Sequence, residues 1–144
     1  MSFVLNENLV VDHTNYTLKN IIDKAYGTLR FNTFTISSSL TSKKGNITIT
    51  THGRPVFAIC TGDLNPGSGT DWCWFRLYRD GVYIRAIIDQ GNANSYNKPF
   101  SISYLDDPPA GLHTYTIEFS QGSGSATFGE EGDFEAPIFT VFEI

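Results

Sequence analysis

The stretch of this chain that most constrains its fold is Pro99–Phe119, where apolar and polar residues alternate on both sides of a proline-rich turn. The apolar residues recur at every second position: Phe100, Ile102 and Tyr104, then Tyr115, Ile117 and Phe119. Between them, Asp-Asp-Pro-Pro-Ala-Gly removes two backbone donors, fixes two φ angles and offers a glycine for a positive φ. The pattern predicts two half-buried strands joined by a tight turn, and these residues do not resemble a catalytic set.

Composition favours an all-β domain. Aromatic residues make up 14% and charged residues 17% of the 144 residues, and strand formers dominate over residues that build long helices. A chain of this length forms one domain that buries about two thirds of its unfolded surface. Turn signals about every ten residues separate roughly eight to ten expected strands, which predicts an antiparallel two-sheet sandwich with jelly-roll topology.

The N-terminal part differs, because apolar residues at helical spacing follow Thr17, a residue suited to an N-cap. We therefore expect one short helix or helical turn over Leu18–Tyr26, preceded by a short strand at Leu9-Val10-Val11. The predicted organisation is a docking segment over residues 1–28 and a β-sandwich head over residues 29–144.

Charge and hydropathy argue against several classes of partner. The net charge is −5 and Lys43-Lys44 is the only adjacent pair of bases, so binding to nucleic acid is not expected. The sequence predicts neither a signal peptide nor insertion into a membrane, because its apolar runs are short. Cys60 and Cys73 are expected to be buried thiols, with a disulfide as the alternative that their distance would decide.

No residues have the spacing of a catalytic or metal site. Asp106 and Asp107 should point to opposite faces of an extended chain, so we interpret them as turn residues. Asp63–Gly67 begins like a calcium loop but lacks its later ligands, and the acidic run Glu130–Glu135 is interpreted as a solvated loop. We therefore expect no enzyme activity and no cofactor, with calcium as the one candidate ion and a hydrolase as the least favoured hypothesis.

The segment Trp72–Tyr78 separates two sets of side chains. One set is Cys73, Phe75 and Leu77, and the other is Trp72, Trp74, Arg76 and Tyr78. One set must face the core. The other is an ordinary exposed face, a subunit interface or a ligand surface. Tyr96 is a further candidate residue for that ligand surface. Aromatic residues and arginine are enriched at interfaces, and flat aromatic rings also stack on sugars.

The chain ends in an apolar strand, Ile138–Ile144. Termini stay ordered only when they are tied down, and an exposed strand of this kind promotes aggregation. We therefore expect this strand either inside the sheet or at a subunit interface.

Three segments carry a family resemblance: Gly53–Val56, Phe75–Gly81 and Pro99–Tyr115. They resemble the small β-sandwich heads of bacteriophage tail fibres and related virion proteins, whose architecture is similar to that of tumour-necrosis-factor-like trimers. The resemblance covers residues 45–144. It implies a homotrimer with the C-terminal strand near the three-fold axis, and hence an interface formed by Ile138, Val141, Phe142 and Ile144.

The resemblance further implies a non-enzymatic virion protein, assembled in the host cytoplasm, that decorates the capsid or forms a tail or fibre tip. Its implied partners are further copies of itself, other virion proteins and, at a tip, a glycan of the host surface. The N-terminal segment would then dock to the particle, and the loops Gly62–Asp71 and Gly91–Lys98 would face partners. The alternative hypothesis is a carbohydrate-binding lectin domain that uses Trp72, Trp74 or Tyr96.

Overall fold

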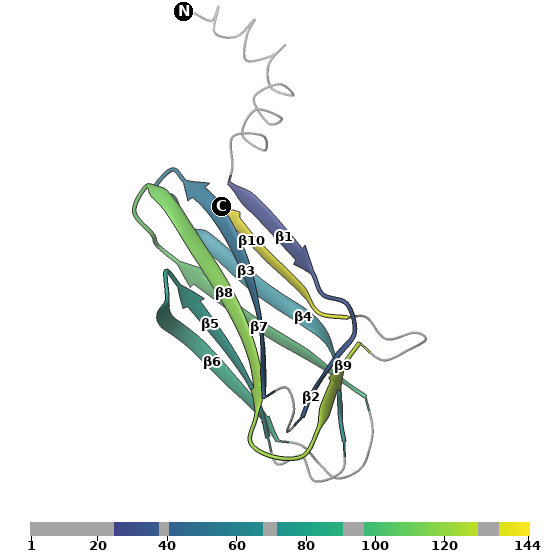
Figure 1. Cartoon of the computed structure of the whole chain (residues 1–144). Coiled ribbons are helices and arrows are strands. Elements are labelled where there is room, and N and C mark those ends of the chain that lie inside the picture. The colour runs from purple at the N-terminus through teal and green to yellow at the C-terminus, as the bar shows by residue number, and fades with distance from the viewer. Residues whose placement is uncertain (1–24, 38–40, 68–71, 91–96, 130–135) are drawn as a thin grey trace, which may run out of the picture.

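The computed structural model describes residues 25–37, 41–67, 72–90, 97–129 and 136–144, which form ten β-strands in two antiparallel sheets. Figure 1 shows the strands running along one elongated sandwich, so the predicted all-β class is confirmed. The expected strand at residues 9–11 and helix residues 18–24 lie outside the described residues. Tyr26, the last residue of the expected helix, lies in a strand instead.

Sheet A contains six strands around the long strand β4: β1 (Tyr26–Arg30), β2 (Phe34–Ile36), β4 (Val56–Pro66), β7 (Lys98–Asp106), β9 (Ala126–Phe128) and β10 (Ile138–Glu143). One edge of β4 pairs with β10 and then with β9, whereas the other edge pairs with β7. β1 pairs with β10, and β2 pairs with β9. β4 is therefore the central strand, and its first five residues, Val56–Cys60, are apolar on both faces.

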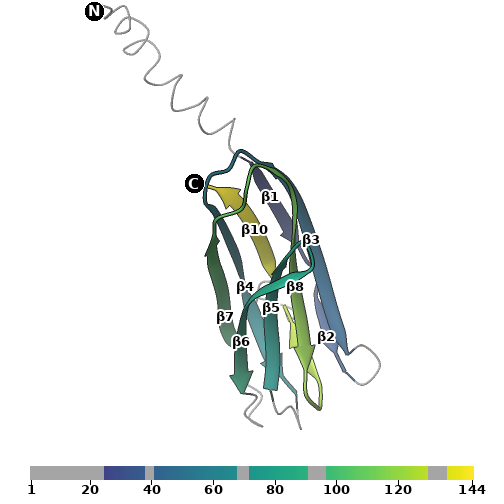
Figure 2. The same ribbon diagram turned by 90° about the vertical axis from the view of Figure 1, so that its left-hand side faces the viewer.

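Sheet B contains four strands: β3 (Ser42–Thr51), β5 (Trp72–Arg79), β6 (Val82–Gln90) and β8 (Gly111–Gln121). Their order is β3-β8-β5-β6, and Figure 2 shows the sandwich from the side. β5 and β6 form a hairpin in which Asp80 and Gly81 have φ angles of 49° and 79°. Two successive positive φ angles are those of the type I′ turn that Asp-Gly predicts.

The C-terminal strand β10 lies inside sheet A, between β1 and β4. Near its end Glu143 is buried, and its carboxylate accepts hydrogen bonds from the Ala25 N–H (3.1 Å) and from His52 Nδ1 (2.7 Å). Burial works to raise the pKa of Glu143, but the hydrogen bonds from His52 outweigh it and lower that pKa. β1 pairs with β10 along its whole length, so the expected domain boundary after residue 28 falls within one strand.

The core between the sheets contains phenylalanine rings from both layers: Phe75, Phe100, Phe119, Phe128 and Phe139, with the partly buried Phe34 packed against them. Phe75 of sheet B stacks on Phe100 of sheet A with ring centroids 4.5 Å apart. Aromatic pairs of this kind add about 0.5–1.5 kcal/mol beyond the area that they bury. The sheets are thus joined by ring contacts across the sandwich.

Strand β4 is longer than the sequence predicted, because Gly62–Asp71 was expected to be a loop. The strand continues to Pro66, and Leu64 within it is almost fully buried. A Cβ atom at Gly62 would lie 2.9 Å from the Cα of Pro137. This glycine therefore permits a close approach of two backbone segments inside the sheet, and it is not a turn signal.

Candidate functional site

Strand β5 places its two sets of side chains as the alternation predicted. The core side carries Cys73, Phe75 and Leu77, all fully buried. The outer face of sheet B carries the other set: Trp72, Trp74, Arg76 and Tyr78. The side chain of Trp72 is 43% exposed, and the other three are half-buried. Tyr96 lies outside the described residues, so four of the five candidate surface residues share one open face.

Glu118 of β8 gathers polar side chains on this outer face. Arg76 Nη1 donates hydrogen bonds to Glu118 Oε1 at 3.2 Å and to Ser120 Oγ at 2.8 Å. Lys44 Nζ of β3 lies 3.1 Å from the other carboxylate oxygen. Burial and the negative charge of Glu118 raise the pKa of Tyr78. We call Lys44, Arg76, Tyr78 and Glu118 the Glu118 cluster.

A shallow depression of about 230 Å³ adjoins the Glu118 cluster, and its lining residues are Lys44, Asn46, Tyr78, Gly81 and Thr116. Thr116 Oγ1 donates a hydrogen bond to Asn46 Oδ1 at 2.8 Å. Of these lining residues, the sequence predicted Tyr78 alone as a surface candidate. The outward alternation of Asn46 and Thr116 is visible along each strand, but their partnership depends on the register between β3 and β8.

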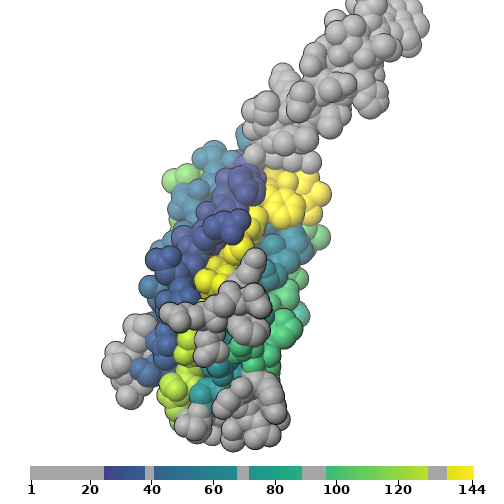
Figure 3. Space-filling view, turned by 90° about the vertical axis from the view of Figure 1, so that its right-hand side faces the viewer, coloured from purple at the N-terminus to yellow at the C-terminus, as the bar shows by residue number. Residues whose placement is uncertain are grey.

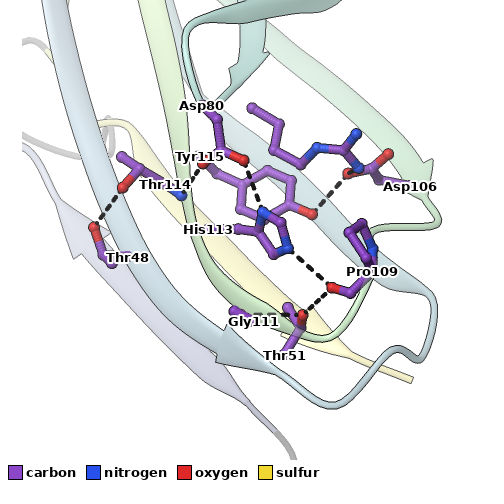
Figure 4. Close-up of polar contacts among 10 residues, drawn as sticks. Thr48, Thr51, Asp80, Asp106, Pro109, Gly111, His113, Thr114 and Tyr115 are labelled. Atoms are coloured by element: carbon purple, nitrogen blue, oxygen red, sulfur yellow. Dashed lines mark hydrogen bonds and ion pairs between the residues drawn. The ribbon is translucent and has the colours of Figure 1, made fainter.

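A second carboxylate cluster closes the end of the sandwich where the chain passes from β7 to β8 (Figure 4). Arg79 Nη1 and the Tyr115 hydroxyl each donate a hydrogen bond to Asp106 Oδ2 at 2.7 Å. Burial and the neighbouring Asp106 raise the pKa of Tyr115. Asp106 is buried whereas Asp107 is exposed, so the two carboxylates face different environments, as the alternation predicted. We call Arg79, Asp106 and Tyr115 the Asp106 cluster.

His113 ties the same turn to the β5–β6 hairpin (Figure 4). Its Nδ1 lies 2.7 Å from Asp80 Oδ2, and its Nε2 lies 2.9 Å from the carbonyl oxygen of Pro109. Carboxylate and carbonyl oxygens only accept, so both hydrogen bonds form together when the ring is an imidazolium. The hydrogen bond to Asp80 raises the pKa of His113 against the effect of burial. We call His113, Asp80 and Pro109 the His113 clasp.

The predicted interface residues divide between the core and the outer face of sheet A. Val141 is fully buried, so its side chain packs within its own chain. Ile138 and Phe142 are half-buried, and Ile144 is 54% exposed. Figure 3 shows this side of the molecule, where β1 and β10 lie next to each other.

The two calcium hypotheses concern Asp63–Gly67 and the acidic run at residues 130–135. Asp63 lies within strand β4 and does not open a loop, and the acidic residues 130–135 lie outside the description. In the described ranges, no three His, Cys, Asp or Glu side chains gather as a metal site would require. Nor does that part of the chain contain a helix suited to crossing a membrane.

Cys60 and Cys73 are both buried thiols, and no disulfide joins them. This arrangement confirms the first of the two alternatives that the sequence allowed. Burial raises the pKa of the Cys60 thiol. The thiolate is the reactive form of cysteine, so Cys60 is an unreactive core residue.

Comparison with known proteins yields a distant likeness only. No protein-family model and no curated protein matches the sequence. Among solved structures, the chain is similar to dimeric latent PorU from Porphyromonas gingivalis, with 8% sequence identity and a TM-score of 0.47. The match covers 83% of this chain but 13% of the PorU chain. A likeness at this level does not indicate a function.

Proposed function

We propose that this protein is a non-enzymatic structural protein of a bacteriophage virion. It is a homotrimeric jelly-roll head that decorates the capsid or forms a tail or fibre tip for host recognition. The observation that carries the proposal is a pair of exposed apolar surfaces, one on sheet A and one along β6. The family resemblance of residues 45–144 supplies the virion context, in which residues 1–28 dock to other virion proteins.

The order of the strands supports the jelly-roll topology. Apart from the short strands β2 and β9, sheet A follows the order β1-β10-β4-β7 and sheet B the order β3-β8-β5-β6. From β3 to β9, successive strands alternate between the sheets except at the β5–β6 hairpin. Each sheet thus combines strands from both halves of the chain, as in two Greek keys wrapped into one sandwich.

The first apolar surface is a row of four side chains across the outer face of sheet A: Tyr26, Phe142, Phe57 and Leu105. Phe57 and Phe142 contact each other with ring centroids 5.7 Å apart. Tyr26 is 66% exposed and Leu105 is 57% exposed. Contiguous exposed apolar groups of this kind mark interaction sites.

The second apolar surface lies along β6, an edge strand of sheet B. Val82, Tyr83 and Ile88 of this strand are all more than half exposed. A long apolar edge strand promotes pairing with other chains unless something covers it. A contact between the face of one copy and the edge of the next is heterologous, and such contacts can close into a ring. The resemblance implies that three copies form the ring.

The test is the mass of the full-length protein in solution at micromolar concentration, measured by sedimentation equilibrium. We expect a trimer. Leu105→Glu should convert the trimer into folded monomers, because the interface would otherwise bury an unpaired charge. The matched control is Leu112→Glu, which changes an exposed leucine on β8 of sheet B and should leave the trimer intact.

A monomeric wild-type protein, or a Leu105→Glu variant that stays trimeric, would contradict the proposed assembly. The virion context is tested separately by mass spectrometry of purified particles. Recovery of this chain in stoichiometric amounts would support the proposal, and its absence from the particles would overturn it.

A further inference from the structure

We propose that the depression on the outer face of sheet B binds one pyranose ring of a surface glycan. The sugar would lie against Tyr78, with its hydroxyl groups bonded by Asn46, Lys44 and Thr116. The inference rests on the proposed function only for the source of the glycan, which would be the host surface. The binding of the sugar is testable whether or not the protein is a trimer.

The depression combines an aromatic ring with a rim of hydrogen-bonding side chains. Tyr78 is its one aromatic lining residue, and Lys44, Asn46 and Thr116 supply an ammonium, an amide and a hydroxyl group. Small-ligand sites use apolar surface for contact and a few placed polar groups for orientation. A pyranose matches this combination, because its C–H groups pack against an aromatic ring while its hydroxyls donate and accept hydrogen bonds.

The side chains of the depression are held in place by contacts within the protein. Tyr78 makes an edge contact with Tyr83, with ring centroids 6.1 Å apart. Asn46 Oδ1 accepts the hydrogen bond from Thr116 at 2.8 Å, which orients the amide. Among the described residues, the NH₂ group of Asn46 has no partner and retains two donors for a ligand. Because these side chains are already ordered, a ligand bears less of the entropic cost of fixing them.

The groups around the depression suit a hydroxyl-rich ligand. Lys44 and Arg76 both lie within 3.2 Å of Glu118, so the carboxylate offsets one of the two positive charges. The hydroxyl groups of a sugar can accept hydrogen bonds from the Lys44 ammonium group and from the Asn46 amide, both of which line the depression.

The aromatic residues of β5 continue beyond the depression along the outer face of sheet B. Trp74 lies two residues from Arg76, whose guanidinium carbon is 4.8 Å from the centre of the Trp74 ring. Trp72 is the next residue on the same face and is 43% exposed. We therefore expect the sugar in the depression to be one unit of a chain that continues along β5 toward Trp72.

The experiment titrates the full-length, ¹⁵N-labelled protein with the methyl glycosides of glucose, galactose, mannose and N-acetylglucosamine. We expect at least one of them to shift the NMR signal of the Asn46 side-chain amide. Calorimetry of the variants with that glycoside should show Asn46→Ala and Tyr78→Ala weakened by about tenfold or more. Tyr78→Phe retains the ring and should still bind, which guards against a loss that reflects misfolding.

The matched control for Asn46→Ala is Thr48→Ala. Thr48 is exposed on the same strand and face as Asn46, and its hydroxyl pairs with Thr114 at 2.9 Å outside the depression. We expect Thr48→Ala to bind like the wild type. The site assignment is overturned if none of the four glycosides shifts the Asn46 amide, or if Asn46→Ala binds as tightly as Thr48→Ala.

The mass of the same samples separates this inference from the proposed assembly. A trimer that binds none of the four glycosides contradicts the sugar site alone. A monomer that binds one of them through Asn46 and Tyr78 contradicts the trimer alone.

Discussion

Asp106 and Glu118 each hold an arginine and lie beside a tyrosine, yet the two carboxylates have different surroundings. Asp106 accepts hydrogen bonds of 2.7 Å from Arg79 and from Tyr115, which is fully buried. Glu118 holds Arg76 at 3.2 Å on the outer face of sheet B, beside an open depression. The first cluster joins a turn to the sandwich, whereas the second leaves polar groups where a ligand can reach them.

The different surroundings of the two clusters arise because their residues occupy adjacent positions along strands β5 and β8. Tyr78 and Arg79 are adjacent on β5, and they lie opposite Thr116 and Tyr115 of β8. Successive side chains of a strand point to opposite faces, so the first pair faces outward and the second faces the core. The comparison shows that the same residue types serve the fold or the surface according to the face on which they lie.

The largest effect on stability is expected from replacing Asp106, the buried carboxylate of the two. Asp106→Ala should lower the free energy of unfolding by about 1–3 kcal/mol, because it leaves the fully buried Tyr115 hydroxyl without its acceptor. Glu118→Ala should cost about 1 kcal/mol or less, because its partners remain accessible to water. Urea denaturation at one fixed protomer concentration measures both values. Equal losses for the two variants would show that the clusters contribute alike.

An intermediate effect is expected from pH, through the His113 clasp that adjoins the Asp106 cluster. The pKa of His113 is raised above its ordinary 6.5, so its contribution is complete below that pH and is lost as pH rises through the raised pKa. Burial works to raise the pKa of Asp80, but the hydrogen bonds from His113 and the Thr114 N–H lower it below 3.8. The Asp80 contribution is therefore lost as pH falls through the lowered value.

The clasp should accordingly stabilise the fold most between about pH 4 and 6.5, by about 1 kcal/mol or less because the Asp80 side chain is 45% exposed. We expect the urea midpoint of the wild type to fall between pH 6 and pH 9 by more than that of His113→Gln. The measurement is paired denaturation of the two proteins at both pH values. Parallel losses in the two proteins would show that another group causes the pH dependence.

The smallest effect on stability is expected from replacing Glu118, the carboxylate on the outer face. Burial is the main cause of the raised pKa of Tyr78, and the negative charge of Glu118 raises it further. Glu118→Gln should therefore lower the pKa of Tyr78 while changing stability by about 0.5 kcal/mol or less. Ultraviolet absorbance titration of the tyrosinate, compared between wild type and variant, measures the shift. An unchanged Tyr78 pKa would mean that burial alone accounts for it.

The sequence predicted the faces of individual strands better than the contacts between them. The alternation within Trp72–Tyr78 separated the core set from the outer set, and Asp80-Gly81 indicated the correct turn. The loop predicted from Gly62 onward was wrong, because a glycine that permits close packing looks the same in sequence as one that ends a strand. Asn46 and Thr116 were not selected, because their hydrogen bond joins residues 70 positions apart.

By itself, the sequence determined the all-β class, the apolar and polar faces of individual strands and the chemistry of the turns. These properties depend on residues that are neighbours in the sequence. The tertiary structure alone decided that the core takes the Cys73 side of β5, that β10 lies between β1 and β4, and that Arg79 meets Asp106. These contacts depend on strand order and register, which are established when the whole core packs at once. No local pattern contains that information.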